Sequence, residues 1–336
     1  MFQQSVQRGN MASVSALSRS STQLLATWRL PGFIRNALPQ AIVEGMQRTK
    51  ARVLSRGLPR QRVFEQPPEH TLASASMSII VAIHDAPVIT KRCLASLASY
   101  ASNSEIILVD DGSRLAETTH VIREFGGRHG WKVISNAQAL GHSAACIAGA
   151  RMATRPYLCL LNSDTVVPPW CWLPVEEAFT ANPAIGVAGP STSQSGNAQT
   201  LDIAALCPFY WNDSQICSFA ERIMTAPPQP LILDLQWVSG FAFFIRRCLW
   251  EKLGGFDRNL PDYGNEIELC TRVNNLGYRT VWVRSSYIHH LGRQSYKNGM
   301  SNHEILSRTL AAQQYIRRRQ RLSSLHSPDQ HSGRDA

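Results

Sequence analysis

From residue 77 onward, short apolar runs alternate with segments of helical periodicity. The apolar runs are only five or six residues long and rich in β-branched side chains, which favours strands over helices. Strands and helices that alternate at this spacing predict an α/β fold with a mostly parallel central sheet. The predicted strands cover residues 78–83, 105–110, 131–135, 157–161 and 278–283, and the predicted helices 87–100, 114–125 and 141–153.

Polar residues follow each of the first four predicted strands. They are His84 and Asp85, then Asp110 to Ser113, then Asn136, and finally Asn162, Ser163 and Asp164. Asp-Gly-Ser alone is an ordinary turn and helix cap, but the carboxyl ends of parallel strands meet at one edge of the sheet, where ligands bind. Four aligned ends therefore predict a site for a polar ligand. A nicotinamide site or a P-loop is disfavoured, because neither glycine-rich motif is present.

The net charge of +10 is concentrated near the N-terminus, where residues 1–76 contain ten Lys and Arg against three Glu. Within this leader, Ile34, Leu38, Ile42 and Met46 are spaced four apart and basic residues follow. Such a segment suits an anionic membrane surface, but also a basic extension that packs on its own domain or has no partner. Nucleic acid is not an expected partner, because no helix-turn-helix, RNP or zinc-finger pattern accompanies the charge.

The chain contains no run of about 18 uncharged apolar residues and no apolar signal-peptide core. We therefore expect a cytoplasmic protein, with peripheral contact to the inner face of the membrane if the leader binds lipid. The eight cysteines are scattered without a C-x-x-C pair, which argues against a disulfide framework or a zinc site. A last helix is expected to begin at Ser301, with Glu304 at capping-box spacing, and to end in the basic cluster 315–322.

Six blocks in order resemble the family-two glycosyltransferases of the GT-A fold, and most closely their rhamnosyltransferase-like branch. The blocks are VDDGS (109–113), NAQALGHSAACIAGA (136–150), LLNSDT (160–165), SGFAFFIRRCLWEKLGGFD (239–257), YGNEIELCTRV (263–273) and YIHHLGRQS (287–295). The resemblance implies one GT-A catalytic domain over residues 77–300, with a Rossmann-like sheet, a nucleotide half (77–165) and an acceptor half (166–300). The leader and residues 301–336, a helix and basic tail, lie outside it.

The same resemblance implies an inverting, metal-dependent transfer of a sugar from a nucleoside-diphosphate sugar to a hydroxyl of a glycan or lipid-linked acceptor, in bacterial cell-surface polysaccharide synthesis. The family holds Mg²⁺ or Mn²⁺ with an Asp-x-Asp motif, and here the first acid is replaced by Asn162. Asp164 is then the expected metal ligand, and His290, preferred over His289, the second. The residues expected to bind the nucleotide-sugar are Ile83, His84, Asp110, Asp111, Asn136, His142, Asn162 and Ser163.

Attack by an acceptor hydroxyl needs a base on the face opposite the leaving phosphate. By resemblance this catalytic base is Glu266, whereas Glu268 points elsewhere because positions i and i+2 of a helix do not share a face. Both could also be first-turn acids that favour the helix dipole, and Asp262 is an alternative base. The residues expected to contact the acceptor are Trp237, Ser239, Gly240 and Glu268.

Residues 190–230 interrupt the alternation of strands and helices, and we expect a loop there that faces the acceptor. Two other functions stay open. The substitution by Asn162 is compatible with a catalytically inactive member that binds nucleotide or acts as a membrane scaffold. A sugar-1-phosphate nucleotidyltransferase is less well supported, because AIHDAP (82–87) lacks the glycine-rich basic loop that this chemistry needs after the first strand.

Overall fold

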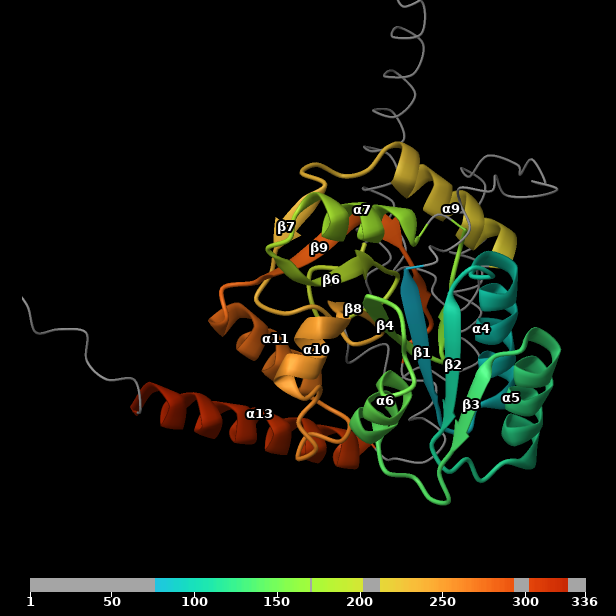
Figure 1. The fold of residues 1–336 in the computed structure, drawn as a ribbon, viewed down its shortest axis with the longest axis horizontal. Coiled ribbons are helices and arrows are strands. Elements are labelled where there is room, and N and C mark those ends of the chain that lie inside the picture. Colours follow the sequence, from blue (N-terminus) through green and yellow to red (C-terminus); the bar gives the residue numbers. More distant parts are fainter. Residues whose placement is uncertain (1–75, 170, 202–211, 293–301, 326–336) are drawn as a thin grey trace, which may run out of the picture. The chain divides into compact units, whose positions relative to one another are not determined.

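The computed structural model describes residues 76–169, 171–201, 212–292 and 302–325. Eight of the described strands form one sheet of order β3-β2-β1-β4-β8-β6-β9-β7 (Figure 1), and two short ones form a separate two-stranded sheet. Neighbours β3, β2, β1 and β4 are parallel, as are β6 and β9, whereas β8 and β7 run antiparallel to their neighbours. The strands are β1 (Met77–Ile83), β2 (Glu105–Asp110), β3 (Lys132–Ser135), β4 (Tyr157–Asn162), β6 (Ile185–Ser191), β7 (Ile232–Asp234), β8 (Ala242–Arg246) and β9 (Arg279–Tyr287).

Helices cover both faces of this sheet (Figure 1). Buried side chains of three helices pack against one face, and buried side chains of three others pack against the opposite face. The apolar strand runs are hydrophobic at nearly every position because both faces are covered. The first set is α4 (Pro87–Tyr100), α5 (Ala116–His129) and α7 (Leu173–Ala181), and the second is α6 (His142–Ala150), α10 (Arg247–Leu253) and α11 (Asn265–Asn275).

The predicted mostly parallel α/β fold is confirmed, but the helix predicted over 114–125 runs from Ala116 to His129, and the helix predicted over 141–153 runs from His142 to Ala150. Helix α5 begins at Ala116 instead of residue 114, because the N–H groups of Arg114 and Leu115 both donate to the Asp85 carboxylate, at 2.8 and 2.9 Å. These two hydrogen bonds connect the segment after β2 to Asp85, which follows the end of β1. Asp85 itself adopts a left-handed backbone (φ 54°), a strained conformation that these bonds stabilise.

The interval 190–230 is not a continuous loop, which corrects the expectation from sequence. Residues 213–225 form helix α9 (Asp213–Thr225), which begins with a capping box between Asn212 and Gln215. Its apolar residues recur every three or four positions, and Phe219 packs edge-on against Tyr287 of β9 with ring centroids 4.9 Å apart. This spacing is that of a helix that covers a sheet. Residues 202–211 of the interval lie outside the described part.

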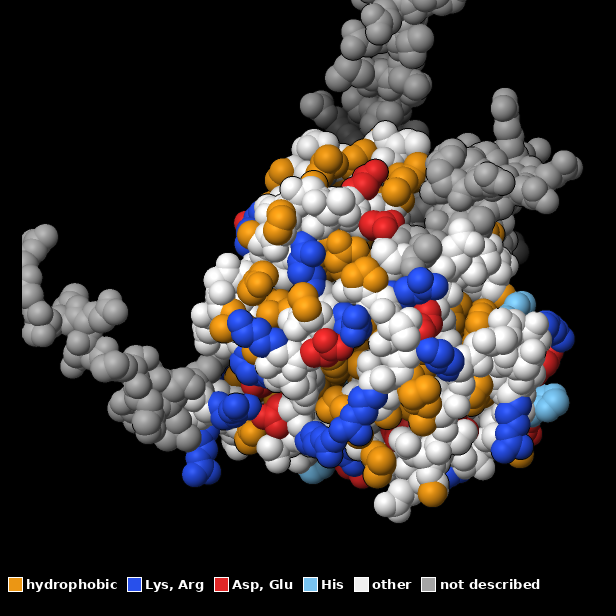
Figure 2. All heavy atoms as spheres, in the orientation of Figure 1, with side chains coloured by type: hydrophobic (Ala, Val, Ile, Leu, Met, Phe, Trp, Pro, Cys, Tyr) orange, Lys and Arg blue, Asp and Glu red, His pale blue; other side chains and the backbone are white. Residues whose placement is uncertain are grey.

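A long helix, α13 (Asn302–Leu325), follows the elements of the sheet in the chain. Ala312 and Ile316 of this helix pack with Leu260, next to Tyr263 and Ile267. The expected capping residue Ser301 and the whole leader, with its predicted membrane contact, lie outside the described residues. Within the described part, no helix has the length and apolar character needed to cross a membrane. On the face seen in Figure 2, Lys and Arg side chains are scattered among apolar and uncharged ones.

Candidate active site

A cavity lies at the carboxyl ends of β1 and β4, the edge that the sequence predicts for a polar ligand. Residues of the sheet edge, of α6 and of the segment before α11 form its wall. Three of the wall residues are aspartates, and no Lys or Arg is among the described residues that line it. The lining residues are Ala82, Ile83, His84, Asp111, His142, Ala145, Asn162, Ser163, Asp164, Asp262, Tyr263 and His290.

Two short strands bring a distant histidine to the end of β4. Strand β10 (His289–His290) pairs antiparallel with β5 (Thr165–Val166), so that His290 lies opposite Thr165. The Nε2 atom of His290 is 3.2 Å from Oδ1 of Asp164, and both side chains are largely buried. Burial lowers the pKa of His290, but Asp164 and the Gln194 carbonyl, 2.6 Å from Nδ1, outweigh it and raise the pKa above its ordinary value.

The ring of His290 has a fixed orientation in this pair. It stacks on Phe241 at 5.1 Å between ring centroids, and Nδ1 donates to the Gln194 carbonyl, which leaves Nε2 directed at Asp164. His289 points away from the cavity, because its Nδ1 atom lies 2.7 Å from the hydroxyl of buried Tyr287. His290 thus lines the cavity and His289 does not, and His290 is the histidine that we expect to be the metal ligand.

Asp111 lines the cavity but its carboxylate is already hydrogen-bonded within the fold. It accepts from the N–H groups of Leu140 and Gly141, at 2.9 and 2.8 Å, and from the Asn136 amide at 2.8 Å. These bonds hold the segment that leads into α6. The Gly141 backbone (φ 93°) has no room for a side chain, because an added Cβ would lie 2.9 Å from Cβ of Pro261.

The predicted nucleotide contacts Asp110 and Asn136 are not part of the cavity wall. The carboxylate of Asp110 accepts from the N–H of Ser113 at 2.9 Å and from the hydroxyl of Thr119 at 3.3 Å. Asn136 donates its amide to Asp111. Both side chains hold loops at the strand ends, and their expected contact with the nucleotide stays a prediction. The other residues expected to bind the nucleotide-sugar line the wall, namely Ile83, His84, Asp111, His142, Asn162 and Ser163.

Glu266 is in the first turn of α11, outside the residues that line the cavity. Its carboxylate lies against Gly240, where an added Cβ would be 3.8 Å from Cδ of Glu266. Burial raises the pKa of Glu266 to about 7. Among the described residues, no side chain donates a hydrogen bond to this carboxylate, whereas its own backbone N–H donates to Asn265. A carboxylate in these surroundings is basic enough to accept a proton near neutral pH.

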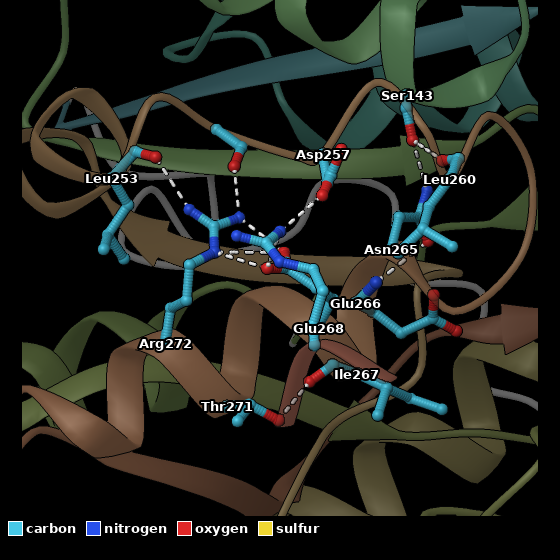
Figure 3. Close-up of polar contacts among 12 residues, drawn as sticks. Ser143, Leu253, Asp257, Leu260, Asn265, Glu266, Ile267, Glu268, Thr271 and Arg272 are labelled. Atoms are coloured by element: carbon cyan, nitrogen blue, oxygen red, sulfur yellow. Dashed lines mark hydrogen bonds and ion pairs between the residues drawn. The ribbon is translucent and has the colours of Figure 1, made fainter. Parts of the chain in front are cut away.

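Glu268 is directed away from Glu266, as Figure 3 shows. Its buried carboxylate accepts from Arg272 at 2.6 to 3.0 Å and from Arg319 of α13 at 3.0 Å. Arg272 also donates to the carbonyls of Leu253 and Gly255. The expectation that Glu268 contacts an acceptor does not agree with this position, because both oxygens serve an ion-pair network that fixes α11.

The segment expected to contact the acceptor, Trp237 to Gly240, adjoins Glu266 but does not line the cavity. The N–H of Ser239 donates to Oε1 of the fully buried Gln199 at 2.7 Å, and Asn197 donates to the carbonyl of Trp237. Sequence reasoning did not identify Gln199, since a glutamine within a polar segment carries no distinctive pattern. It also did not identify Tyr263 as a wall residue.

Residues 78–217 match the model of Glycosyl transferase family 2. The predicted resemblance to family-two glycosyltransferases is therefore confirmed for this segment, which contains the first three of the six motifs and lies on a GT-A fold. The match does not single out the rhamnosyltransferase-like branch.

Two curated relatives are the O-antigen biosynthesis protein RfbC of Myxococcus xanthus, 24% identical over 234 residues, and the poly-beta-1,6-N-acetyl-D-glucosamine synthase of Staphylococcus epidermidis, 23% identical over 154 residues. The alignments cover 64% and 44% of this chain but only 17% and 37% of those relatives. A crystal structure of GalNAc-T7 with UDP, GalNAc and Mn²⁺ matches with a TM-score of 0.50 at 19% identity, over 70% of this chain and 48% of that one. This likeness concerns the fold.

Proposed function

We propose that this chain is a metal-dependent, inverting glycosyltransferase that moves a sugar from a nucleoside-diphosphate sugar to a hydroxyl of a glycan or lipid-linked acceptor in polysaccharide synthesis. The observation that carries the proposal is the charge pattern of the cavity: three aspartates and no Lys or Arg among its described lining residues. A diphosphate carries negative charge and needs a counter-charge, which the described lining residues do not supply from Lys or Arg side chains. A bound divalent cation would supply it.

The residues at the end of β4 fit such a cation. Asp164 offers a carboxylate oxygen and His290 an imidazole nitrogen, 3.2 Å apart and buried. Among the described residues there is no group of three or more potential side-chain ligands, so phosphate oxygens and water would complete the shell. Mg²⁺ is commonly bound by one or two protein ligands plus substrate phosphates, and Mn²⁺ accepts similar oxygen and imidazole ligands. When bound, the cation stabilises the negative charge that develops on the departing diphosphate.

Glu266 is the proposed general base. The acceptor hydroxyl oxygen forms a bond to the anomeric carbon of the donor sugar, the bond from that carbon to the phosphate oxygen breaks, and its electron pair leaves with the nucleoside diphosphate. The hydroxyl proton passes to the Glu266 carboxylate. A pKa of about 7 suits this role, because the group is largely ionised just above neutral pH and still basic enough to take the proton.

A test of this proposal uses the purified chain with UDP-N-acetylglucosamine, UDP-galactose, GDP-mannose and dTDP-rhamnose as donors. Release of nucleoside diphosphate is measured with Mn²⁺, with Mg²⁺ and with EDTA. The proposal expects release from at least one donor with metal and its loss with EDTA. Metal-dependent binding of a nucleoside diphosphate without turnover of any donor would favour the inactive nucleotide-binding protein, which the replacement of an acid by Asn162 keeps as the second candidate.

A further inference from the structure

Helix α13 packs against the segment that precedes Glu266. Ala312 and Ile316 contact Leu260 and Tyr263 in a small apolar cluster. Gly264 has a left-handed backbone (φ 75°), and an added Cβ there would lie 2.9 Å from Cδ1 of Ile316. The left-handed backbone favours glycine at this position, and the close approach of Ile316 shows that the helix packs directly on the segment.

An ion pair crosses the same contact and reaches the cavity. Arg308 of α13 donates from Nη1 to Oδ2 of Asp262 at 2.7 Å. The Asp262 side chain is only 12% exposed and is part of the cavity wall. Its other oxygen, Oδ1, accepts from the backbone N–H of His142, another wall residue, at 3.5 Å. One carboxylate oxygen is thus bonded to α13 and the other to the first residue of α6, at the wall of the cavity.

The opposite side of this segment is fixed to the start of α6. The N–H of Ser143 donates to the Pro261 carbonyl at 2.8 Å, and its hydroxyl donates to the Leu260 carbonyl at 2.5 Å. The amide of Asn265 in turn donates to the Ser143 hydroxyl at 2.9 Å, as Figure 3 shows. Asp262 therefore lies on a turn that is held between α6 and α13, which gives its carboxylate a defined position.

The position of Asp262 suggests which part of a donor it would meet. Asp164 and His290 line the part of the cavity that is proposed to hold the phosphates. Glu266, the proposed base, comes shortly after Asp262 in the chain, in the first turn of α11. The transferred sugar must lie between the phosphate and the base. A carboxylate would repel phosphate, whereas the hydroxyl groups of a sugar are donors that a carboxylate accepts well.

We infer that Asp262 accepts hydrogen bonds from hydroxyl groups of the transferred sugar and thereby contributes to donor specificity, and that Arg308 of α13 is the positioning residue that holds it. This inference rests on the proposed function. It makes the C-terminal helix part of the sugar site, although the helix lies outside the segment that matches the family.

The test compares Asp262→Ala and Asp262→Asn with the wild-type chain. Two affinities are measured with Mn²⁺ present: that of the donor selected by the panel above, and that of its bare nucleoside diphosphate. Loss of hydrogen bonds to a charged acceptor is expected to weaken donor binding, and to raise the donor KM, by about 10- to 100-fold in Asp262→Ala. The affinity for the bare nucleoside diphosphate should stay within about twofold, because only the sugar contact is lost.

The positioning role is tested by Arg308→Gln, with Arg308→Lys as the conservative variant and Arg317→Gln as a matched control. Arg317 is an exposed arginine of the same helix, so its loss changes the charge equally. Arg308→Gln should raise the donor KM by about 3- to 10-fold, Arg308→Lys should recover most of the loss, and Arg317→Gln should change nothing. Amide exchange at residues 260–264 should become faster in Arg308→Gln, a readout that needs no donor.

Three results would overturn the inference. Equal weakening of the donor and of the bare nucleoside diphosphate in Asp262→Ala would show that Asp262 does not recognise the sugar. A fall in kcat at unchanged KM would show that it acts as the base. Unchanged amide exchange in Arg308→Gln would show that Arg308 does not position Asp262. This readout needs no donor, so it is distinct from the failure of the proposed function, which would appear as no turnover of any donor in the panel.

Discussion

The loops that follow β1 and β2 and the first turn of α11 hold carboxylates in opposite ways. In the two loops, the carboxylates of Asp85 and Asp111 each accept hydrogen bonds from two consecutive backbone N–H groups. In the first turn of α11, the Glu266 carboxylate accepts no hydrogen bond from a described side chain, and burial raises its pKa to about 7. The pKa of Asp85, in contrast, is lowered, because its hydrogen bonds and nearby His84 and Arg114 outweigh the upward effect of burial.

This contrast teaches that position at a strand end or helix start does not by itself define the role of an acid. A carboxylate whose ionised form is stabilised by backbone N–H groups is a weak base and a good support for loops. A carboxylate that is largely withdrawn from water and accepts no hydrogen bond from a side chain retains its proton to higher pH and can accept one during a reaction. Asp164, paired with a histidine, represents a third arrangement suited to a cation.

The largest expected effect is that of Asp164→Ala. Removal of the proposed metal carboxylate should lower the transfer rate by on the order of a thousandfold or more, because the charge on the departing diphosphate loses its stabilisation. Release of nucleoside diphosphate at saturating Mn²⁺ measures the rate, and circular dichroism checks the fold. Turnover close to that of the wild type would show that Asp164 has no part in the metal site.

Glu266→Gln should have the next largest effect. Glutamine keeps the shape but cannot accept a proton, so the transfer rate should fall by about a hundredfold or more while donor affinity stays the same. Glu268→Gln gives the matched comparison within the same helix turn. It should leave the rate per folded molecule nearly unchanged but lower the stability by about 1 to 3 kcal/mol, because Arg272 and Arg319 lose a charged acceptor. A large fall in the transfer rate of Glu268→Gln together with a nearly unchanged rate of Glu266→Gln would contradict our distinction between the two acids.

The pH dependence of kcat/KM tests the same distinction in the unmodified chain. The pKa of Glu266 is raised to about 7, so its carboxyl group is protonated below that pH and ionised above it. Only the ionised form accepts a proton, and kcat/KM should therefore fall about tenfold for each pH unit below about 7 and level off above it. A profile that stays flat down to about pH 5 would exclude a carboxyl group of raised pKa as the base.

Asp111→Ala is expected to change the transfer rate least and to lower the free energy of unfolding instead. The N–H groups of Leu140 and Gly141 would lose their acceptor, at an expected cost of about 1 to 3 kcal/mol in the free energy of unfolding. Urea denaturation measures this, with Glu117→Ala, an exposed acid in the first turn of α5, as the control. A change no greater than that of the control would show that Asp111 does not support the loop.

The sequence predicts much of the fold and the location of the site. The helix over 87–100 and the strand over 105–110 have the predicted bounds, since apolar periodicity is a local property of the chain. Asp164 and Glu266 are named through the resemblance to the glycosyltransferase family, and each also follows an element that the sequence predicts, a buried strand in one case and a turn before a helix in the other. The parallel arrangement then fixes which strand ends share an edge.

Only the tertiary structure decides which polar groups face one another. The pairing of β10 with β5 brings His290, not His289, to Asp164. Two arginines of α13 form ion pairs with the segment below it: Arg319 with Glu268, and Arg308 with Asp262 at the cavity wall. Asp110 and Asn136 stand at strand ends, as ligand contacts would, yet they do not line the cavity, and their side chains are hydrogen-bonded to Ser113, Thr119 and Asp111. The physical reason is that a polar side chain pairs with whichever donor or acceptor the folded chain brings within about 3 Å, and residues far apart in sequence supply those partners.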